Sequence, residues 1–164
     1  MNTQIIRAKE TDFETVKDIT QTTIKSVYPK YYPEGAVQFF SDYHSDERIL
    51  NDIVDGKVYL LEADGSFVGT VTISGNEITR LFVLPQHQRN GYGKMLMDYA
   101  EELIGKDNET IVLDSSFPGK RMYIKRGYLP DGSGVWYQDK QCVQYETVCT
   151  VDDDLILYLY KKLK

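Results

Sequence analysis

Gln88-Arg89-Asn90-Gly91-Tyr92-Gly93-Lys94 joins a β-rich run to the start of an amphipathic helical pattern. The two glycines let the backbone approach an anion closely, and several amide N–H groups are exposed where a helix begins. Arg89 and Lys94 place positive charge at a helix end whose dipole disfavours cations unless an anion balances them. The stretch therefore predicts a seat for a pyrophosphate, although a Gly-x-Gly turn can also be only a tight connection.

The flanking segments predict a strand, a turn and a helix in that order. Residues 78–85 read Ile-Thr-Arg-Leu-Phe-Val-Leu-Pro, a β-rich run that stops at a proline, which cannot continue a strand ladder. From Tyr92, apolar residues recur at i, i+3, i+4, i+7, i+8, i+11 and i+12 as far as Ile104, which indicates a helix with one buried face. Gly105 is expected to cap that helix.

Two other glycine motifs that bind phosphates do not fit. A P-loop requires Gly-x-x-x-x-Gly-Lys followed by Ser or Thr, and a dinucleotide fingerprint requires Gly-x-Gly-x-x-Gly after the first strand; the chain has neither. The pattern that remains, Gln-x-x-Gly-x-Gly between a mid-chain strand and a long helix, resembles the acetyl-CoA motif of the GNAT superfamily of N-acetyltransferases. An unrelated nucleotide-binding domain that uses the same glycines is an alternative.

A second signature of that family is similar to residues 116–128. The family pattern reads roughly Asn-x-x-Ala-x-x-x-Tyr-x-Lys-x-Gly-Phe, and the chain has Ser-Phe-Pro-Gly-Lys-Arg-Met-Tyr-Ile-Lys-Arg-Gly-Tyr. The matching residues are Tyr123, Lys125 and Gly127. The departures from the commonest residues are Ser116, Gly119 and Tyr128. Both signatures occur in the family's order, and the resemblance extends over residues 3–162.

The pattern of segments predicts one α/β (α+β) domain over residues 1–164. Successive strands joined by two-residue turns predict an antiparallel meander, after which strands and helices alternate. The resemblance implies a GNAT-like fold, with a mixed, mostly antiparallel central sheet and helices on both faces. It also implies that the motif strand, 77–84, and the strand 111–116 run parallel and splay apart, so that the pantetheine arm enters the gap.

The elements themselves follow from periodicity and turn signals. The predicted helices are residues 13–27, 36–43, 45–55, 92–104 and 118–126. The first is expected to open with a capping box of Thr11 and Glu14, and the third with Ser45 as its cap. The predicted strands are 58–63, 67–74, 77–84 and 110–114, with further strands within 128–160.

The resemblance implies acetyl-CoA as the cofactor and indicates the residues that would hold it. These are Leu81, Phe82, Val83, Gln88, Arg89, Asn90, Gly91, Tyr92, Gly93, Lys94 and Ser116. Main-chain N–H groups near Leu81 to Val83 are the family's usual oxyanion donors. A backbone donor leaves no mark in the sequence, and Leu81 and Val83 are also ordinary core residues of a strand.

Two side chains are candidates for the acid–base chemistry of acetyl transfer. Glu77, the candidate base, begins the motif strand eleven residues before Gln88, the spacing found in histone-type members of the family. If side chains alternate strictly along this strand, Glu77 lies on the same face as Leu81 and Val83, unless a bulge reverses this relation. A carboxylate that only closes a hairpin, water relayed through Glu77, and no dedicated base are alternatives. Tyr123 is the candidate acid for the leaving thiolate, with a packing role as its alternative.

Composition limits the class of protein. The net charge of −6, from 25 acidic and 19 basic residues, argues against a nucleic-acid partner and for a cationic or neutral acceptor. No run of roughly 18 apolar residues occurs and no signal-peptide pattern is present, so we expect a cytoplasmic protein without a membrane partner. Cys142 and Cys149, with His44 and His87, do not form a ligand pattern, so no metal site is expected.

These observations predict an acetyl-CoA-dependent N-acetyltransferase that passes the acetyl group directly to a primary amine of a small molecule or peptide. No triad with a nucleophilic Cys or Ser suggests a covalent acyl-enzyme. A non-catalytic acetyl-CoA-binding or regulatory domain of the same fold is the alternative. Tyr28, Tyr31 and Tyr32 either border the acceptor pocket or pack in the core. The sequence leaves open the acceptor, the use of longer acyl-CoAs and whether the chain forms a homodimer.

Overall fold

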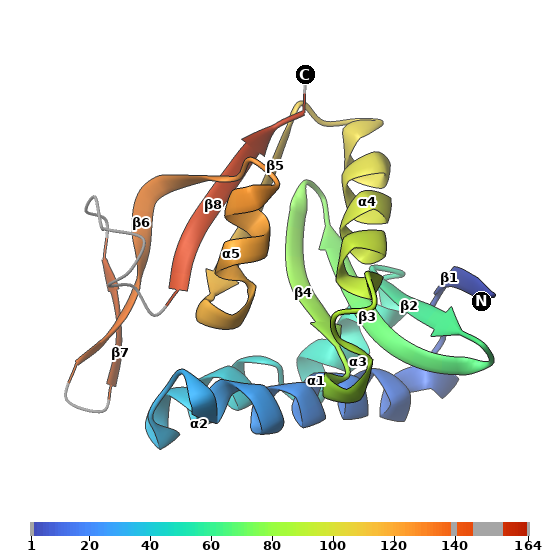
Figure 1. Ribbon diagram of the computed structural model, residues 1–164, viewed down its shortest axis with the longest axis horizontal. Helices are drawn as coiled ribbons and strands as arrows, with labels where there is room; N and C mark the ends of the chain where they lie inside the picture. Colours follow the sequence, from blue (N-terminus) through green and yellow to red (C-terminus); the bar gives the residue numbers. More distant parts are fainter. Residues whose placement is uncertain (1, 139–140, 146–155, 164) are drawn as a thin grey trace.

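One mixed sheet forms the centre of the molecule (Figure 1). The computed structural model describes residues 2–138, 141–145 and 156–163. Within them, eight strands lie in the order β1-β2-β3-β4-β5-β8-β6-β7. The strands are β1 (Thr3–Arg7), β2 (Val58–Ala63), β3 (Ser66–Ser74), β4 (Glu77–Val83), β5 (Thr110–Ser116), β6 (Leu129–Gln138), β7 (Gln141–Tyr145) and β8 (Ile156–Lys162). All neighbours are antiparallel except β4 and β5, which confirms the predicted mixed, mostly antiparallel sheet.

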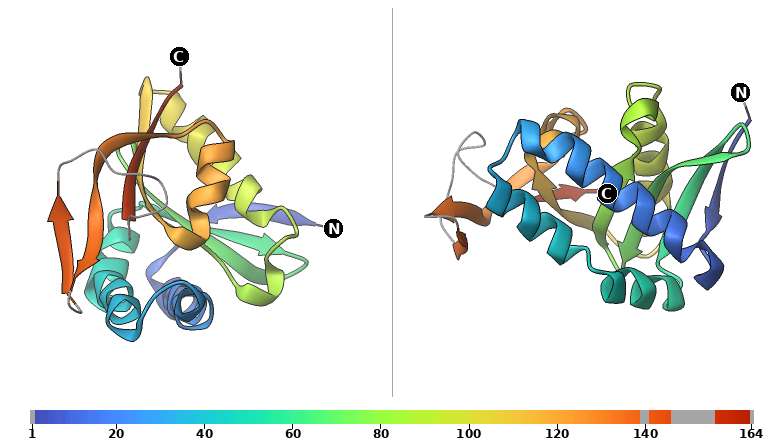
Figure 2. Two further views of the ribbon diagram at one scale, coloured as in Figure 1. Left: turned by 60° about the vertical axis from the view of Figure 1, so that its left-hand side comes forward. Right: turned by 90° about the horizontal axis from the view of Figure 1, so that it is seen from below.

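Helices cover both faces of the sheet. They are α1 (Phe13–Val27), α2 (Glu34–Tyr43), α3 (Asp46–Val54), α4 (Tyr92–Gly105) and α5 (Phe117–Lys125), with short 3-10 turns at Glu10–Asp12, Tyr28–Lys30 and Pro85–His87. The helices α1, α2 and α3 pack on one face, and α4 and α5 lie on the other (Figure 1 and Figure 2). Each face has its own buried apolar cluster, and none of the described helices is long and apolar enough to cross a membrane.

Two tight turns build the meander β2-β3-β4, as the sequence predicts. Asp64 (φ 49°) and Gly65 (φ 83°) both adopt the positive φ that a type I′ hairpin requires. In the second turn, Asn76 accepts a hydrogen bond from Val112 N (3.0 Å) at its carbonyl and donates one from its side chain to the Thr110 carbonyl (3.1 Å). This turn therefore holds β5 beside the start of β4.

A bulge in β4 decides which way Glu77 points. On β3, Thr72 pairs with Arg80 and Ile73 pairs with Ile78, so Thr79 is the extra residue of β4. Ile78 consequently joins the buried cluster beneath α4, although strict alternation would place it on the opposite face with Arg80. The period-two expectation that Glu77 shares a face with Leu81 and Val83 is therefore wrong, because the bulge turns Glu77 to the face covered by α1 and α2.

The strands β4 and β5 separate immediately after this bulge. They pair only at Glu77 with Val112 and at Ile78 with Leu113, and from there they diverge (Figure 1). The predicted splayed parallel pair is thus confirmed. From Arg80 to Val83, β4 pairs with β3 on one side and has no strand partner on the other among the described residues.

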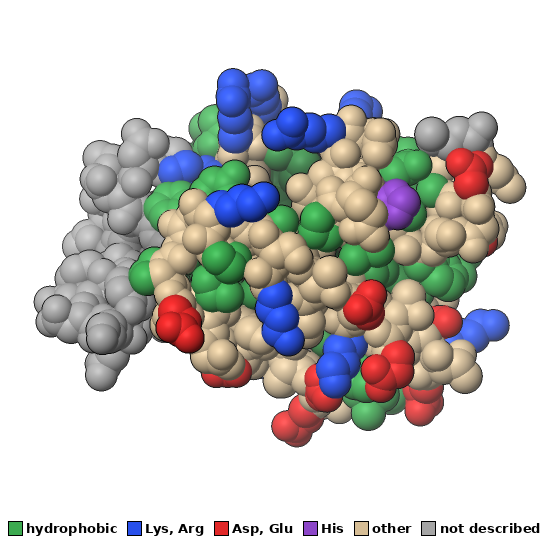
Figure 3. Space-filling view, turned by 60° about the horizontal axis from the view of Figure 1, so that its bottom comes forward, with side chains coloured by type: hydrophobic (Ala, Val, Ile, Leu, Met, Phe, Trp, Pro, Cys, Tyr) green, Lys and Arg blue, Asp and Glu red, His purple; other side chains and the backbone are tan. Residues whose placement is uncertain are grey.

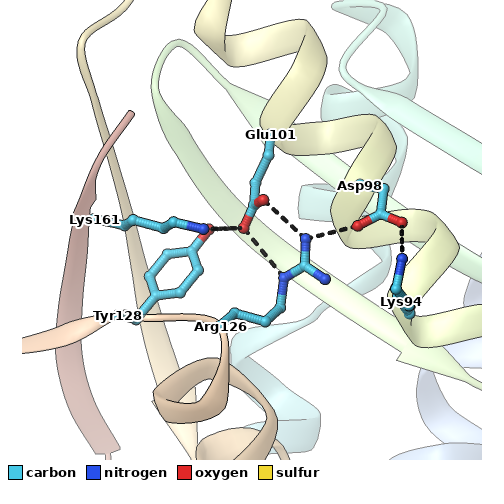
Figure 4. Close-up of polar contacts among 6 residues, drawn as sticks. All are labelled: Lys94, Asp98, Glu101, Arg126, Tyr128 and Lys161. Atoms are coloured by element: carbon cyan, nitrogen blue, oxygen red, sulfur yellow. Dashed lines mark hydrogen bonds and ion pairs between the residues drawn. The ribbon is translucent and has the colours of Figure 1, made fainter. Parts of the chain in front are cut away.

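An ion-pair network ties α4 to the end of α5 and to β8 (Figure 4). Glu101 accepts hydrogen bonds from Arg126 Nε (3.2 Å) and Nη2 (2.8 Å), from the Tyr128 hydroxyl (3.1 Å) and from Lys161 Nζ (3.4 Å). Arg126 Nη2 also donates to Asp98 (2.8 Å). Because Tyr128 stands where the family signature most often has Phe, its hydroxyl adds a bond that Phe could not make.

Two predicted helix signals are wrong. Thr11 and Glu14 do not form a capping box; instead the Asp12 carboxylate accepts from Lys9 N (2.8 Å) and a 3-10 turn leads into α1. Gly105 is not a left-handed cap, since it is the last residue of α4 and Lys106 follows in right-handed conformation (φ −63°). Ser45 does cap α3 by accepting from Arg48 N (3.3 Å).

Candidate active site

The turn before α4 presents backbone donors that the protein leaves unused. Arg89 (φ 65°) and Gly91 (φ 82°) adopt the left-handed conformation, and Gly91 is the N-cap of α4. Among the described residues, no acceptor contacts the amide N–H of Arg89, Asn90, Gly91, Gly93 or Lys94. Successive free N–H groups at a helix N-terminus can bind phosphate oxygens. The backbone thus has the form expected of a pyrophosphate seat.

The side chains of Gln88 and Asn90 brace this turn from within. Gln88 Nε2 donates to the Val83 carbonyl (3.0 Å), and Asn90 Nδ2 donates to the His87 carbonyl (3.1 Å). The side-chain NH2 groups of both residues therefore help to hold the loop in shape. Tyr92, another predicted cofactor residue, is buried in the core beneath α4.

The two cations of the turn differ in their contacts. Arg89 is exposed. Lys94 is also exposed, and its Nζ lies 2.6 Å from Asp98, one helical turn further along α4 (Figure 4). An anion seated on the turn would lie beside both side chains.

A cleft of about 720 Å³ opens where β4 and β5 diverge. Leu81 and Phe82 line it, whereas Val83 does not. The Val83 carbonyl accepts from Thr23 Oγ1 (3.3 Å) as well as from Gln88, so that group is occupied. The walls come from β4, β5, α2, α5 and the strands β6 and β8, and they bring both predicted catalytic residues, Glu77 and Tyr123, into one cavity.

Two tyrosines hold the start of α5. The Tyr28 hydroxyl lies 2.9 Å from Ser116 Oγ, and the Tyr32 hydroxyl accepts from Phe117 N at 2.6 Å. Ser116, which stands in place of the family's Asn, therefore has its side chain engaged within the protein. Tyr28 is buried and also lines the cleft, so it combines the two roles considered for the cluster, whereas Tyr31 is exposed.

Tyr123 offers an unused phenol to the cleft. Its side chain is 7% exposed, and its hydroxyl has no hydrogen-bond partner among the described residues. Burial, with a smaller contribution from Tyr28, raises the pKa of this phenol, so it keeps its proton at neutral pH. The ring packs on Gly119, where a Cβ would lie only 2.8 Å from Tyr123 Cε2. The Gly at this position, where the family commonly has Ala, thus sets the position of the ring.

Three carboxylates face the cleft from three strands: Glu77 on β4, Asp114 on β5 and Asp131 on β6. Partial loss of hydration, reinforced by the charges of Glu77 and Asp131, raises the pKa of Asp114 to about 7, although its side chain is exposed toward the open cleft. Burial raises the pKa of Glu77 as well. The sequence did not indicate Asp114 as a functional residue, because its only signal there is a charged side chain within a β-branched strand.

His44 and Arg80 line the cleft, but neither presents an unbalanced charge to it. The buried guanidinium donates to Asp52 (3.0 Å), Thr72 Oγ1 (2.8 Å) and His44 Nδ1 (3.4 Å). Burial, together with Arg80 and Arg48, lowers the pKa of His44 to about 3, so the imidazole is neutral. Nothing in the sequence distinguishes His44, because its burial depends on elements far apart in the chain.

The surface near α1 and α2 carries mixed charge. Figure 3 shows Lys and Arg side chains scattered over this face, with acidic groups interspersed in its lower half.

Replacing Asp114 by Asn should change how stability depends on pH. The folded carboxyl keeps its proton to about pH 7, whereas the unfolded one, with its ordinary pKa of 3.8, loses it earlier. Between these values the folded state binds more protons, so wild-type stability falls as pH rises. Relative to wild type, Asp114→Asn should therefore gain Tm between about pH 4 and about pH 8. The exposed Asp107→Asn is the matched control, and a constant Tm difference for Asp114→Asn would contradict the prediction.

Solved structures of acetyltransferases share this architecture. A GCN5-related N-acetyltransferase from Rhodopseudomonas palustris superposes with a TM-score of 0.81 at 18% identity, over 99% of this chain and 96% of the other. The PaiA N-acetyltransferase from Thermoplasma acidophilum, solved with coenzyme A, gives 0.75 at 21% identity, over 99% of each chain. YncA from Salmonella typhimurium, a putative acetyltransferase solved with acetyl-CoA, gives 0.70 at 11%, over 100% of this chain and 95% of the other.

The sequence comparison agrees with the fold. No curated protein sequence matches the chain significantly. The family model described as acetyltransferase (GNAT) domain matches residues 27–145, which include the turn at Gly91, the splayed strands and most of the cleft. Because this match spans well over half of the chain and carries both of its signatures, the chain belongs to the GNAT family of acetyltransferases.

Proposed function

We propose that this protein is an acetyl-CoA-dependent N-acetyltransferase that transfers the acetyl group directly to a primary amine of a small molecule or peptide. One observation carries the proposal. Free N–H groups for a diphosphate lie at one end of the gap between β4 and β5, and a cleft with an unpartnered phenol and a carboxylate lies along the same gap. Groups suited to hold a diphosphate and groups suited to exchange protons thus lie along one opening, which supports the proposal.

The chain offers suitable groups for the diphosphate and the arm of the cofactor. The N–H groups of Arg89, Asn90, Gly91, Gly93 and Lys94 would donate to phosphate oxygens, with the two cations beside them. Between Thr79 and Val83, β4 lacks a strand partner on its β5 side, so its backbone could bind an amide-bearing arm as another strand would.

The acid–base chemistry divides between the two walls of the cleft. Acetyl-CoA supplies the thioester carbonyl, where the new N–C bond forms and the C–S bond breaks. Glu77, with its raised pKa, is suited to accept the proton that the ammonium must lose, directly or through water. Backbone N–H groups of β4 near Leu81 would stabilise the oxyanion. Tyr123, which stays protonated, would donate its proton to the departing thiolate, and the second proton that the nitrogen loses would restore the phenol.

Acetyl-CoA and a pooled amine library test this function. Thiol release together with a product heavier by one acetyl group is the expected result. Binding of acetyl-CoA without thiol release from any amine would favour the non-catalytic alternative. Protection by ATP and not by CoA in a thermal-shift assay would instead favour an unrelated nucleotide-binding domain.

Tyr123→Phe should lower turnover by about 100-fold, because it removes the proton donor but keeps the ring. Acetyl-CoA affinity in a calorimetric titration should stay within about twofold of wild type, since the hydroxyl takes no part in holding the diphosphate. Unchanged steady-state turnover would remove Tyr123 from the mechanism and leave it a packing role.

Gly91→Val should weaken acetyl-CoA binding by at least tenfold, because a branched side chain strains the left-handed N-cap and blocks approach of the phosphates. Gly65→Val is the matched control, since Gly65 has almost the same φ (83°), and neither position has an atom within 4 Å of an added Cβ. Equal affinities of both variants, measured by calorimetry, would contradict the predicted seat.

Gly119→Ala should lower turnover by roughly tenfold, because the new methyl must displace the ring of Tyr123 from its place above residue 119. Acetyl-CoA affinity should be unchanged. The control is Gly105→Ala in α4, where the added Cβ meets only Leu163 at an ordinary 3.6 Å. Turnover that is equal in both variants would show that the ring position does not limit the reaction.

A further inference from the structure

We infer that the amine acceptor is a linear aliphatic diamine or polyamine, with Glu77 facing the nitrogen that is acetylated and Asp114 and Asp131 holding a second ammonium group. This inference rests on the proposed transferase function and adds the chemical class of the acceptor. It follows from how the carboxylates are arranged, from the absence of competing cations among the described lining residues and from the unused phenol.

The three carboxylates form a row across the sheet. In the order β4-β5-β8-β6, Glu77 is paired with Val112, two residues before Asp114 on the same face of β5. Asp114 is opposite Tyr158 on β8, and Asp131 follows Pro130, which is opposite Leu159. With neighbouring strands about 4.8 Å apart, a row over these four strands extends roughly 14 Å. An extended chain with amines at intervals suits such a row better than a compact single amine does.

The three carboxylates have no cationic partner in the part of the chain that the structure describes. Among the described residues, none of Glu77, Asp114 and Asp131 is paired with a Lys, Arg or His; Asp131 accepts only from Ser133 N (2.8 Å) and Oγ (2.7 Å). The charges of Glu77 and Asp131 both act on Asp114. Like charges held close together destabilise one another, and a bound dication would relieve this repulsion.

The charge of Arg80, the cationic side chain among the described lining residues, is already balanced by Asp52. Arg80 is the one Lys or Arg among the described lining residues, and its three donor nitrogens are engaged by Asp52, Thr72 and His44. The described lining residues therefore offer no free cation to a carboxylate or phosphate on the acceptor. An amino acid or an acidic peptide would bring a negative group toward the acidic row, which disfavours its binding.

A second feature of the cleft that points to a ligand is the unpartnered hydroxyl of Tyr123. The hydroxyl of Tyr123 is held in a side chain that is more than nine-tenths buried, yet it has no partner among the described residues. The hydroxyl itself is accessible from the cleft, so a bound ligand can supply the hydrogen-bond partner that the described residues do not. The aromatic rings of Phe39 and Tyr43 line the same cleft, and they can pack against methylenes and face an ammonium group.

Matched substrates test the inference. Diaminobutane, aminobutane and aminobutyrate have the same four-carbon chain but end in an ammonium, a methyl or a carboxylate group. We expect kcat/KM for diaminobutane to exceed that for aminobutane by at least tenfold, equivalent to about 1.4 kcal/mol, with aminobutyrate slowest. Equal use of diaminobutane and aminobutane, or a preference for aminobutyrate, would overturn the inference while leaving the transferase function intact.

Variants separate this role from a structural one. Asp114→Asn and Asp131→Asn should each raise KM for diaminobutane by about tenfold and lower the ratio of kcat/KM for diaminobutane to that for aminobutane by a similar factor. Asp107→Asn, an exposed carboxylate outside the cleft, should alter neither. A loss of activity that is equal for both amines would assign Asp114 to folding or to proton transfer and so refute the inference.

A binding measurement keeps the inference testable without turnover. Diaminobutane should raise the Tm of the wild-type protein more than aminobutane does, and this difference should disappear in the Asp114→Asn, Asp131→Asn double variant. If no amine is acetylated but this difference is seen, the transferase function fails and the diamine site stands. If the amines are acetylated but the difference is absent, the diamine site fails alone.

Discussion

The loss of hydrogen bonding between β4 and β5 after two residue pairs is the constraint on which the site depends. A strand inside a sheet normally has both rows of its backbone groups paired, and unpaired groups in a protein interior are costly. Here the bulge at Thr79 turns β4, and the strand then continues beside β3 with its other edge open. The open edge creates the cleft, and the same bulge turns Glu77 into it, so one irregularity of the backbone provides both the space and a reactive group.

The helix α5 is fixed at both ends, which explains how a short helix can place Tyr123 accurately. At its start, the hydroxyls of Tyr28 and Tyr32, which lie between α1 and α2, contact Ser116 Oγ and the Phe117 amide. At its end, Arg126 and Tyr128 bind Glu101 of α4. Each residue that departs from the commonest family signature thus makes a specific contact: Ser116 with Tyr28, Gly119 with the ring of Tyr123, and Tyr128 with Glu101.

Local chemistry explains what could be predicted from the sequence. The turn at Gly91, the hairpin at Asp64 and Gly65 and the helix from Tyr92 depend on glycine conformations and on apolar spacing, which a sequence displays directly. The direction of Glu77 could not be fixed, since one extra residue in β4 reverses every earlier position. The pKa values of Asp114 and His44 depend on burial and on charges from strands and helices that are distant in the chain, so the sequence could not indicate them. Thr11 does not cap the first helix, because the hydrogen bond from Lys9 N to Asp12 forms a different turn there.

The shared carboxylate of Asp98 has a consequence for how an anion would arrive at the turn. Asp98 accepts from both Lys94 and Arg126, and Arg126 is anchored on Glu101 as well. Lys94 can therefore move away from Asp98 without leaving this carboxylate unpaired, because Arg126 continues to donate a hydrogen bond to it. If the proposed cofactor binds at this turn, Lys94 would be able to move to its phosphate and return to Asp98 when the cofactor leaves.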